Sequence, residues 1–354
     1  FRYILCMLIY LLFLPAITLF RNRERFAYHY RRSVLAGTGT ALLSELTAFI
    51  LVLFMPEKLT GRIVGSILPT MLIGTVLYVY FIRRGHKPEP AHVRYALPIA
   101  LPYVPHLLSM IVLHSMDKIM IIRLCGEEEN ALYSLAYNCG MMTALLQSPM
   151  DEAFSPWLAK RLALGERQTV RQMSLPYFGV LAYGALGVML VSPEVLWVLG
   201  GMQYAEARYV IPPITLGFVC QFAYMMLVNV EQYRKKTVGM ALASVSAAVL
   251  NCVLNLLFIP RFGYIAAAYT TLAGYLWLYT VHLFLVKRLG DGDLYKNRAI
   301  LGTMAVLCTA TAGVTVLYSH AGIRYAVLAV YLGVTAVLFC RYRSVLQQVL
   351  FGKK

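Results

Sequence analysis

Eleven apolar runs of about 20 residues follow one another along this chain and restrict its fold more than any other feature, because about 20 apolar residues in a helix cross the hydrocarbon core of a bilayer. Of the 354 residues, 60% are hydrophobic and 14% are charged, whereas about 25% charged is usual in soluble domains. We therefore expect an all-α polytopic membrane protein with about eleven transmembrane helices. The expected spans are 1–20, 33–55, 63–82, 95–122, 130–150, 173–191, 209–230, 237–259, 264–286, 299–318 and 323–340.

The loops between these runs predict the orientation of the chain. Six alternate segments hold 24 of the 32 Lys and Arg residues, and the loop at 127–130 on the other side is acidic. By the positive-inside rule, the basic segments and the C-terminus are cytoplasmic and Phe1 is outside. The net charge of +16 is thus mainly a topology signal, and we expect no nucleic-acid partner. The basic segments are 21–32, 83–94, 151–172, 232–236, 287–298 and 341–354.

Enzymatic chemistry is not expected from this sequence. No expected loop is long enough for a soluble catalytic domain, and no nucleophile–base pair, phosphate loop or metal-ligand spacing is present. The seven cysteines lie in or beside apolar runs without a CxxC pair, which indicates buried thiols and not a metal site or disulfides. We expect no bound cofactor. The chain also begins inside an apolar run at Phe1, so we expect it to be truncated at its N-terminus.

The segment 94–140 combines prolines and charges within an apolar run. Pro98, Pro102 and Pro105 each remove a backbone donor, which predicts a kinked helix and a hinge. Asp117 and Lys118 follow, with His114 three and four residues earlier, and charges inside such runs usually have a function. One interpretation is that Lys118, together with Arg123, faces a cavity and attracts an anionic substrate, while Asp117 holds a partner charge or binds a proton or sodium ion. The other is an interfacial pair, since Asp117 lies about 35 Å along the helix from Arg94.

Three further polar residues lie in expected spans. Glu45 has no charged neighbour within its span, so it either contacts a coupling ion or a sugar, or makes a structural hydrogen bond. Asn251 and Asn255 share a helix face at i and i+4. Contact between helices is the usual role of such residues, and sugar binding is the alternative.

Four stretches of the sequence together resemble one known family. They are YALPIALPYVPHLLSMIVLHSMDKIMIIRLCGEEENALYSLAYN at 95–138, FSPWLAKR at 154–161, SPEVLWVLGGMQYAEARYVIPPITLG at 192–217 and LNCVLNLLFIPRFGYIAAAYTTLAGY at 250–275. Their order and spacing resemble the polysaccharide, or O-antigen-type, flippases of the MOP superfamily. These proteins share a fold with the lipid II flippases and the multidrug MATE antiporters.

The resemblance implies a two-lobe helical bundle whose first lobe is incomplete here. Residues 1–90 would be a partial N-terminal lobe (helices four to six of the family), 91–290 a six-helix C-terminal lobe and 291–354 two additional helices. It further implies a monomeric flippase in a bacterial inner membrane that moves a polyprenyl-pyrophosphate-linked oligosaccharide during synthesis of O-antigen, capsule or exopolysaccharide. A Na⁺ or H⁺ gradient would drive it, membrane lipid would surround it, and polysaccharide polymerase and chain-length proteins would be its partners.

Under this interpretation Lys118, Arg123, Asn251 and Asn255 contact substrate, and Glu45 and Asp117 bind the coupling ion. Two alternatives remain open. A drug or organic-cation antiporter on the same fold would have an acidic cavity, whereas a flippase would have a cationic one. A membrane-embedded polysaccharide polymerase or ligase would need a large outer loop with Arg and His.

Overall fold

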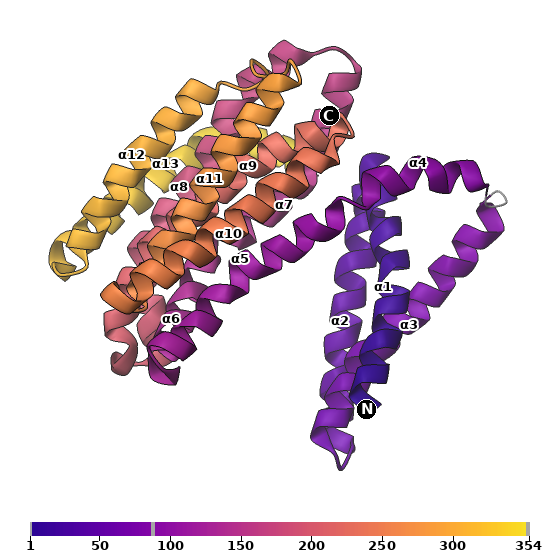
Figure 1. Cartoon of the computed structure of the whole chain (residues 1–354), viewed down its shortest axis with the longest axis horizontal. Coiled ribbons are helices and arrows are strands. Elements are labelled where there is room, and N and C mark those ends of the chain that lie inside the picture. The colour runs from indigo at the N-terminus through magenta and orange to yellow at the C-terminus, as the bar shows by residue number, and fades with distance from the viewer. Residues whose placement is uncertain (1, 86–88, 352–354) are drawn as a thin grey trace. The chain divides into compact units, whose positions relative to one another are not determined.

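The chain forms two compact helical units, 1–94 and 95–354, in a computed structural model that describes residues 2–85 and 89–351, with side chains over 3–85 and 89–343. Parts of two predicted basic segments, 86–88 and the side chains from 344 onward, lie outside the described residues. The elements of the described residues are helical (Figure 1), which confirms the expected all-α class.

The first unit is a three-helix assembly of α1 (Arg2–Phe26), α2 (Tyr30–Phe54) and α3 (Lys58–Arg84). Glycines on α3 let the backbones approach one another closely. A Cβ atom added to Gly65 would lie 2.3 Å from the Cα atom of Ala48 on α2, and one added to Gly74 would lie 2.8 Å from Phe13 on α1. Such close contact between small residues is how helices associate in lipid, where apolar burial gives little driving force.

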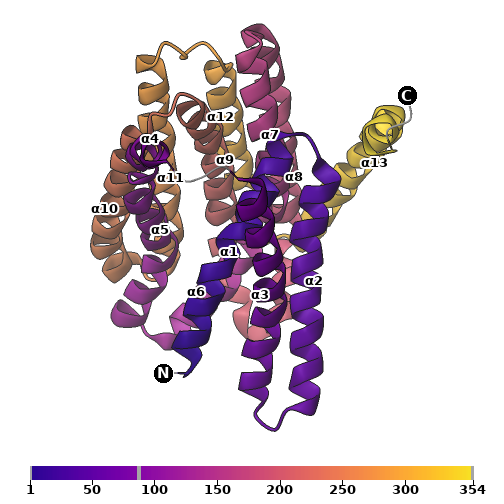
Figure 2. The same cartoon turned by 90° about the vertical axis from the view of Figure 1, so that its right-hand side faces the viewer.

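The second unit is built around α9 (Ile211–Tyr233), which is enclosed by other helices. The other elements are α5 (Tyr103–Leu124), α6 (Glu127–Met141), α7 (Thr143–Ala163), α8 (Arg167–Gly200), η1 (Met202–Val210), α10 (Thr237–Phe262), α11 (Ile265–Arg288), α12 (Asn297–Leu317) and α13 (Ala321–Phe351), and α4 (Pro90–Ala100) precedes them. Toward the C-terminus α13 diverges from the other helices of this unit (Figure 2). The outer helices expose many large apolar side chains, as a lipid-facing surface requires.

Nine helical segments of the described residues are long and apolar enough to cross a membrane, against the eleven expected. The run at 264–286 does form a helix, α11, but Thr270, Thr271 and His282 are among the polar residues that lower its hydropathy. The run at 130–150 is divided at Met142 between α6 and α7. The basic segment 151–172 is helical apart from 164–166, because α7 continues to Ala163 and α8 begins at Arg167.

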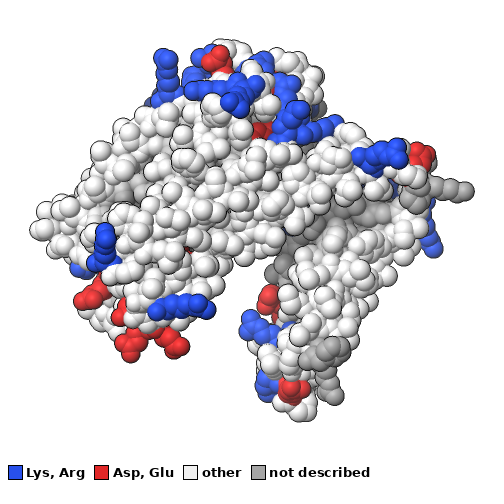
Figure 3. Space-filling model, in the orientation of Figure 1, with Lys and Arg blue, Asp and Glu red and all other residues white. Residues whose placement is uncertain are grey.

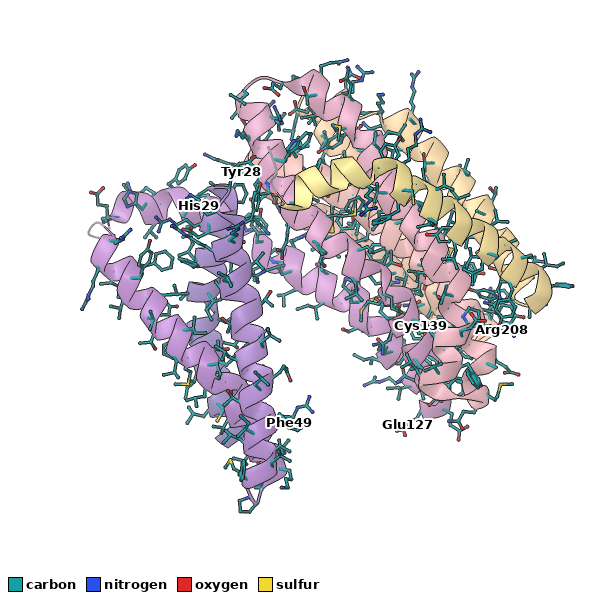
Figure 4. The ribbon with its side chains drawn as sticks, turned by 180° about the vertical axis from the view of Figure 1, so that it is seen from behind. Tyr28, His29, Phe49, Glu127, Cys139 and Arg208 are labelled. Atoms are coloured by element: carbon teal, nitrogen blue, oxygen red, sulfur yellow. The ribbon has the colours of Figure 1, made fainter. Side chains whose placement is uncertain are left out.

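Charged side chains of the second unit gather at its two ends, and the face between them in Figure 3 is almost free of charge. Glu127 at the start of α6 and Arg208 in η1 lie toward the same end (Figure 4). Because charge is costly in hydrocarbon, this distribution is the one expected of a unit that crosses a bilayer.

The predicted proline hinge coincides with the interruption between α4 and α5. α4 ends at Ala100 and α5 begins at Tyr103, so Pro102 lies in the break, with Pro98 before it and Pro105 after it. The Ile99 carbonyl accepts a hydrogen bond of 2.9 Å from the Thr237 hydroxyl of α10. A side chain thus satisfies a backbone carbonyl at the break, as an interrupted helix in lipid requires.

Candidate functional site

Asp117 is the centre of a buried polar cluster in the second unit. Its side chain is 0% exposed, although it lies on the long apolar helix α5. Asn255 Nδ2 of α10 donates to Asp117 Oδ1 over 2.6 Å, and the Tyr133 hydroxyl of α6 donates to Oδ2 over 2.8 Å. The Thr271 hydroxyl of α11 donates to the same Oδ2 atom. Four helices therefore meet at one carboxyl group, which is buried by protein.

The two asparagines predicted to share a helix face extend this cluster. Asn255 Nδ2 also lies 3.2 Å from Asn251 Oδ1, and Asn251 Nδ2 lies 3.5 Å from the Thr271 hydroxyl. The Thr270 hydroxyl donates to Asn255 Oδ1. Asn251 and Asn255 are both 0% exposed, so their side chains are oriented by these contacts and not by water.

Local sequence explains why the helices come close enough for these bonds. Asn251 and Asn255 are separated by four residues and therefore lie one above the other on α10. On α11, a Cβ atom added to Gly274 would lie 3.2 Å from Leu113 of α5 and 3.8 Å from Asn251. A methyl group there would require the end of the Leu113 side chain to move by a few tenths of an ångström. The glycine thus allows α11 to pack closely against α5 beside Thr270 and Thr271.

The chemistry of the cluster depends on its single buried carboxyl group. The ion pairs found among the described residues do not include Asp117, so its carboxyl group is met by neutral donors. Buried charge of this kind is costly unless it is neutralised. Carboxyl, amide and hydroxyl oxygens are ligands suited to a hard monovalent or divalent cation. The described residues contain no group of three or more His, Cys, Asp or Glu side chains placed to hold a metal ion.

His114 connects this cluster to neighbouring aromatic residues. Its Nδ1 atom lies 3.0 Å from the Tyr137 hydroxyl and 3.2 Å from the Tyr275 hydroxyl. The Lys118 ammonium lies 5.2 Å from the centroid of the Tyr137 ring, within the range of a cation–π contact. Lys118 is partly exposed, so its charge lies at the edge of the buried cluster and not inside it.

Two other predicted residues lie elsewhere. Arg123, near the end of α5, is exposed and has no place in the Asp117 cluster. Glu45 of the first unit lines a groove of about 780 Å³ between α1, α2 and α3, which Arg21 and Arg62 also line. This groove thus has one acidic and two basic side chains in a mainly apolar lining.

A second charged cluster lies outside the spans at one end of the second unit. Asp291, whose side chain is 1% exposed, accepts hydrogen bonds from Arg167 over 2.5 Å and from Arg234 over 2.7 and 3.0 Å. Burial alone raises the pKa of Asp291, but the bonds from Arg234 and Arg167 outweigh this effect and bring the pKa below its ordinary value. This cluster joins the start of α8, the end of α9 and the loop after α11.

Sequence reasoning missed three members of the Asp117 cluster, namely Tyr133, Thr270 and Thr271. The adjacent threonines stand in a run of small residues, Ala266–Ala268 and Gly274, where close helix packing is usual. That pairing was a usable signal for Thr270 and Thr271. Tyr133 gave no such signal, because tyrosines near a span end resemble an aromatic belt.

Comparisons with known proteins agree with the fold and the resemblance. Residues 1–161 match the model of the family described as "Polysaccharide biosynthesis protein". The chain is similar to the solved structure titled "Lipid II flippase MurJ, inward closed conformation", with 13% identity, a TM-score of 0.53, and coverage of 87% of this chain and 67% of that chain. A comparison with curated proteins gave no match. The family match includes the first two of the four sequence stretches, and the solved structure has a similar fold.

Proposed function

We propose that this protein moves a lipid-linked saccharide from one leaflet of a membrane to the other and is a transporter, not an enzyme. The observation that carries this proposal is the combination of the family match over 1–161 with a lipid II flippase fold over most of the chain. A lipid carrier requires a protein embedded in the bilayer, and the apolar surfaces of both units suit that environment.

The substrate class we propose is a polyprenyl-pyrophosphate-linked oligosaccharide used for a cell-surface polysaccharide. The protein would lie in a bacterial inner membrane with its C-terminus in the cytoplasm, since the basic segments alternate with apolar runs. Lys118 supplies a partly exposed positive charge suited to an anionic pyrophosphate. Polysaccharide polymerase and chain-length proteins would act on the transported product.

The coupling ion, Na⁺ or H⁺, would be held by Asp117. Its three neutral donors come from α6, α10 and α11, so a change in its charge alters bonds to three helices at once. The interruption at Pro102 would let α5 change its direction relative to α4. This arrangement supports a transport cycle in which ion binding and helix bending are linked.

The test uses a bacterium whose own polysaccharide flippase gene is deleted. The protein is expressed, and the lipid-linked glycan exposed on the outer leaflet is measured with a membrane-impermeant glycosidase. We expect exposure with the unaltered protein, a large loss with Asp117→Asn, and no loss with Asp293→Asn, whose side chain is exposed. Absence of outer-leaflet glycan with the unaltered, membrane-inserted protein would contradict the proposed function. Efflux of organic cations in the same cells would favour the antiporter alternative.

A further inference from the structure

A second pair of titratable side chains is buried in the same unit and takes no part in the Asp117 cluster. His282 of α11 is 0% exposed and Glu231 of α9 is 1% exposed. His282 Nδ1 lies 2.8 Å from Glu231 Oε1. Glutamate and histidine are both costly to bury, and their presence between two tightly packed helices needs a chemical reason.

Each member of the pair has one polar atom without a protein partner. Glu231 Oε2 and His282 Nε2 are both buried, and neither makes a hydrogen bond with any described residue. A pair that served only to join α9 and α11 would be expected to have both atoms satisfied. The free oxygen and the free ring nitrogen are atoms that accept or release a proton.

The surroundings of the pair are aromatic and weakly charged. The Tyr224 ring stacks on the His282 ring, with centroids 5.5 Å apart and planes at 15°. From α5, His106 lies within electrostatic range of His282, and Tyr103 within range of Glu231. α10 contributes the neutral Ser244, which contacts His106 over 2.5 Å. The other titratable groups on the surrounding elements are Asp151, Tyr177, Cys220, Tyr279, Tyr295 and the Arg234–Asp291 pair.

We infer that Glu231 and His282 together form a binding site for one exchangeable proton. With the proton bound, the pair is neutral overall, either as a carboxylate beside an imidazolium or as a carboxylic acid beside a neutral imidazole. Release of the proton to water leaves a carboxylate beside a neutral imidazole and one net negative charge. Because an uncompensated charge is costly in a dry interior, the pair releases its proton as the pH rises and does so more readily when water reaches it.

Aromatic contacts connect this proton site to the Asp117 cluster. Tyr224 stacks on Tyr275, with centroids 6.3 Å apart and planes at 14°. The Tyr275 hydroxyl in turn contacts His114 over 3.2 Å, and His114 contacts Tyr137. A shift of α9 relative to α11 thus alters both the proton site and the aromatic contacts beside Asp117. The proton site itself does not rest on the proposed transport of a lipid-linked saccharide.

The test measures proton uptake by the purified full protein in detergent, without substrate, between about pH 5 and about pH 9, the range in which histidine commonly changes charge. Uptake is followed with a pH indicator, and the carboxylic acid signal by infrared difference spectroscopy. The double variant Glu231→Gln/His282→Asn is compared with the unaltered protein. Two neutral amides can keep a hydrogen bond between α9 and α11, so the variant removes the proton site while preserving the helix contact.

Compared with the unaltered protein, we expect the double variant to take up one proton fewer per chain. It should also lose the infrared signal of the Glu231 carboxylic acid, which is identified as the signal that Glu231→Gln alone removes. The control Glu128→Gln/His320→Asn changes two exposed side chains of the same types. It loses only the titration of these exposed groups, and the Glu231 infrared signal stays. Equal proton uptake and an unchanged infrared signal in the Glu231→Gln/His282→Asn variant would overturn the inference and leave a purely structural pair. Export of glycan is measured separately, so either proposal is able to fail alone.

Discussion

Replacement of Asp117 by alanine tests whether the polar cluster depends on a single carboxyl group. The substitution removes the acceptor of three hydrogen bonds, from Tyr133, Asn255 and Thr271. A buried donor that loses its partner costs about 1–3 kcal/mol, so three such donors cost roughly 3–9 kcal/mol if none finds another acceptor. The hydroxyl of Thr271 is able to rotate toward other acceptors, which places the expected loss nearer about 3–5 kcal/mol.

Asp117→Asn is the informative companion variant, because it keeps the shape of the side chain. Its amide group occupies the Oδ2 position, where the Tyr133 and Thr271 hydroxyls are able to accept hydrogen bonds, and its oxygen still accepts from Asn255. We expect a loss of about 1–2 kcal/mol, well below that of the alanine variant. Ion coupling is lost in both variants, so the two variants separate stability from function.

The assay is unfolding of the detergent-purified protein by increasing denaturing detergent, followed by circular dichroism. Asp293→Ala, at an exposed loop position, is the control for loss of an aspartate. The expected order of stability is unaltered protein and control first, then Asp117→Asn, then Asp117→Ala. An alanine variant as stable as the control would refute the reasoning, since the three donors would then have no need of Asp117.

Three further predictions concern other parts of the chain. The pKa of Asp291 is lowered in the folded protein, so its stabilising effect is fully present above the ordinary aspartate pKa of about 4 and is lost as the pH falls below that value. Asp291→Asn should therefore flatten the acid side of a profile of thermal stability against pH, and an unchanged profile would contradict the stabilising role of Asp291. Gly65→Ala places a methyl group 2.3 Å from the Ala48 Cα atom, so we expect the free energy of unfolding to fall by about 1–3 kcal/mol in the same unfolding assay. The control Gly39→Ala places its methyl group where no atom lies within 4 Å, so it should be tolerated. Lys118→Ala should reduce glycan export, measured by glycosidase exposure, while the amount of protein in the membrane, measured by immunoblotting, stays the same. Normal export would rule out the substrate role of this lysine.

The number and positions of most helices follow directly from the sequence, because the thickness of the bilayer sets the length of the apolar run that crosses it. Helix ends follow less well. The apolar run at 130–150 was expected to end before the basic segment 151–172, yet α7 extends through Pro149 and Pro156 to Ala163. Proline removes one backbone hydrogen bond of the helix, but contacts from neighbouring helices in a membrane protein stabilise the helix at that point. Local composition does not contain that information.

Within the candidate site, spacing predicted which residues share one helix face and failed for residues from different helices. Asn251 and Asn255 lie together as four-residue spacing requires, but the bond from Asn255 to Asp117 depends on tertiary packing that no local pattern specifies. The partner of Glu231 was missed for the same reason. Glu231 lies beside a basic helix end and resembles a surface residue, whereas its contact, His282, is 51 residues further along the chain.

The bond between Thr237 and the Ile99 carbonyl has a consequence for how the protein is made. The two residues are 138 positions apart, and so are Asp117 and Asn255. When the interrupted helix first leaves the ribosome, neither its open carbonyl nor its acidic side chain has these partners. Synthesis of α10 and α11 supplies them later. The segment that carries the break and the acid thus enters the bilayer with unmet polar groups, and its biogenesis is completed only when the later helices arrive.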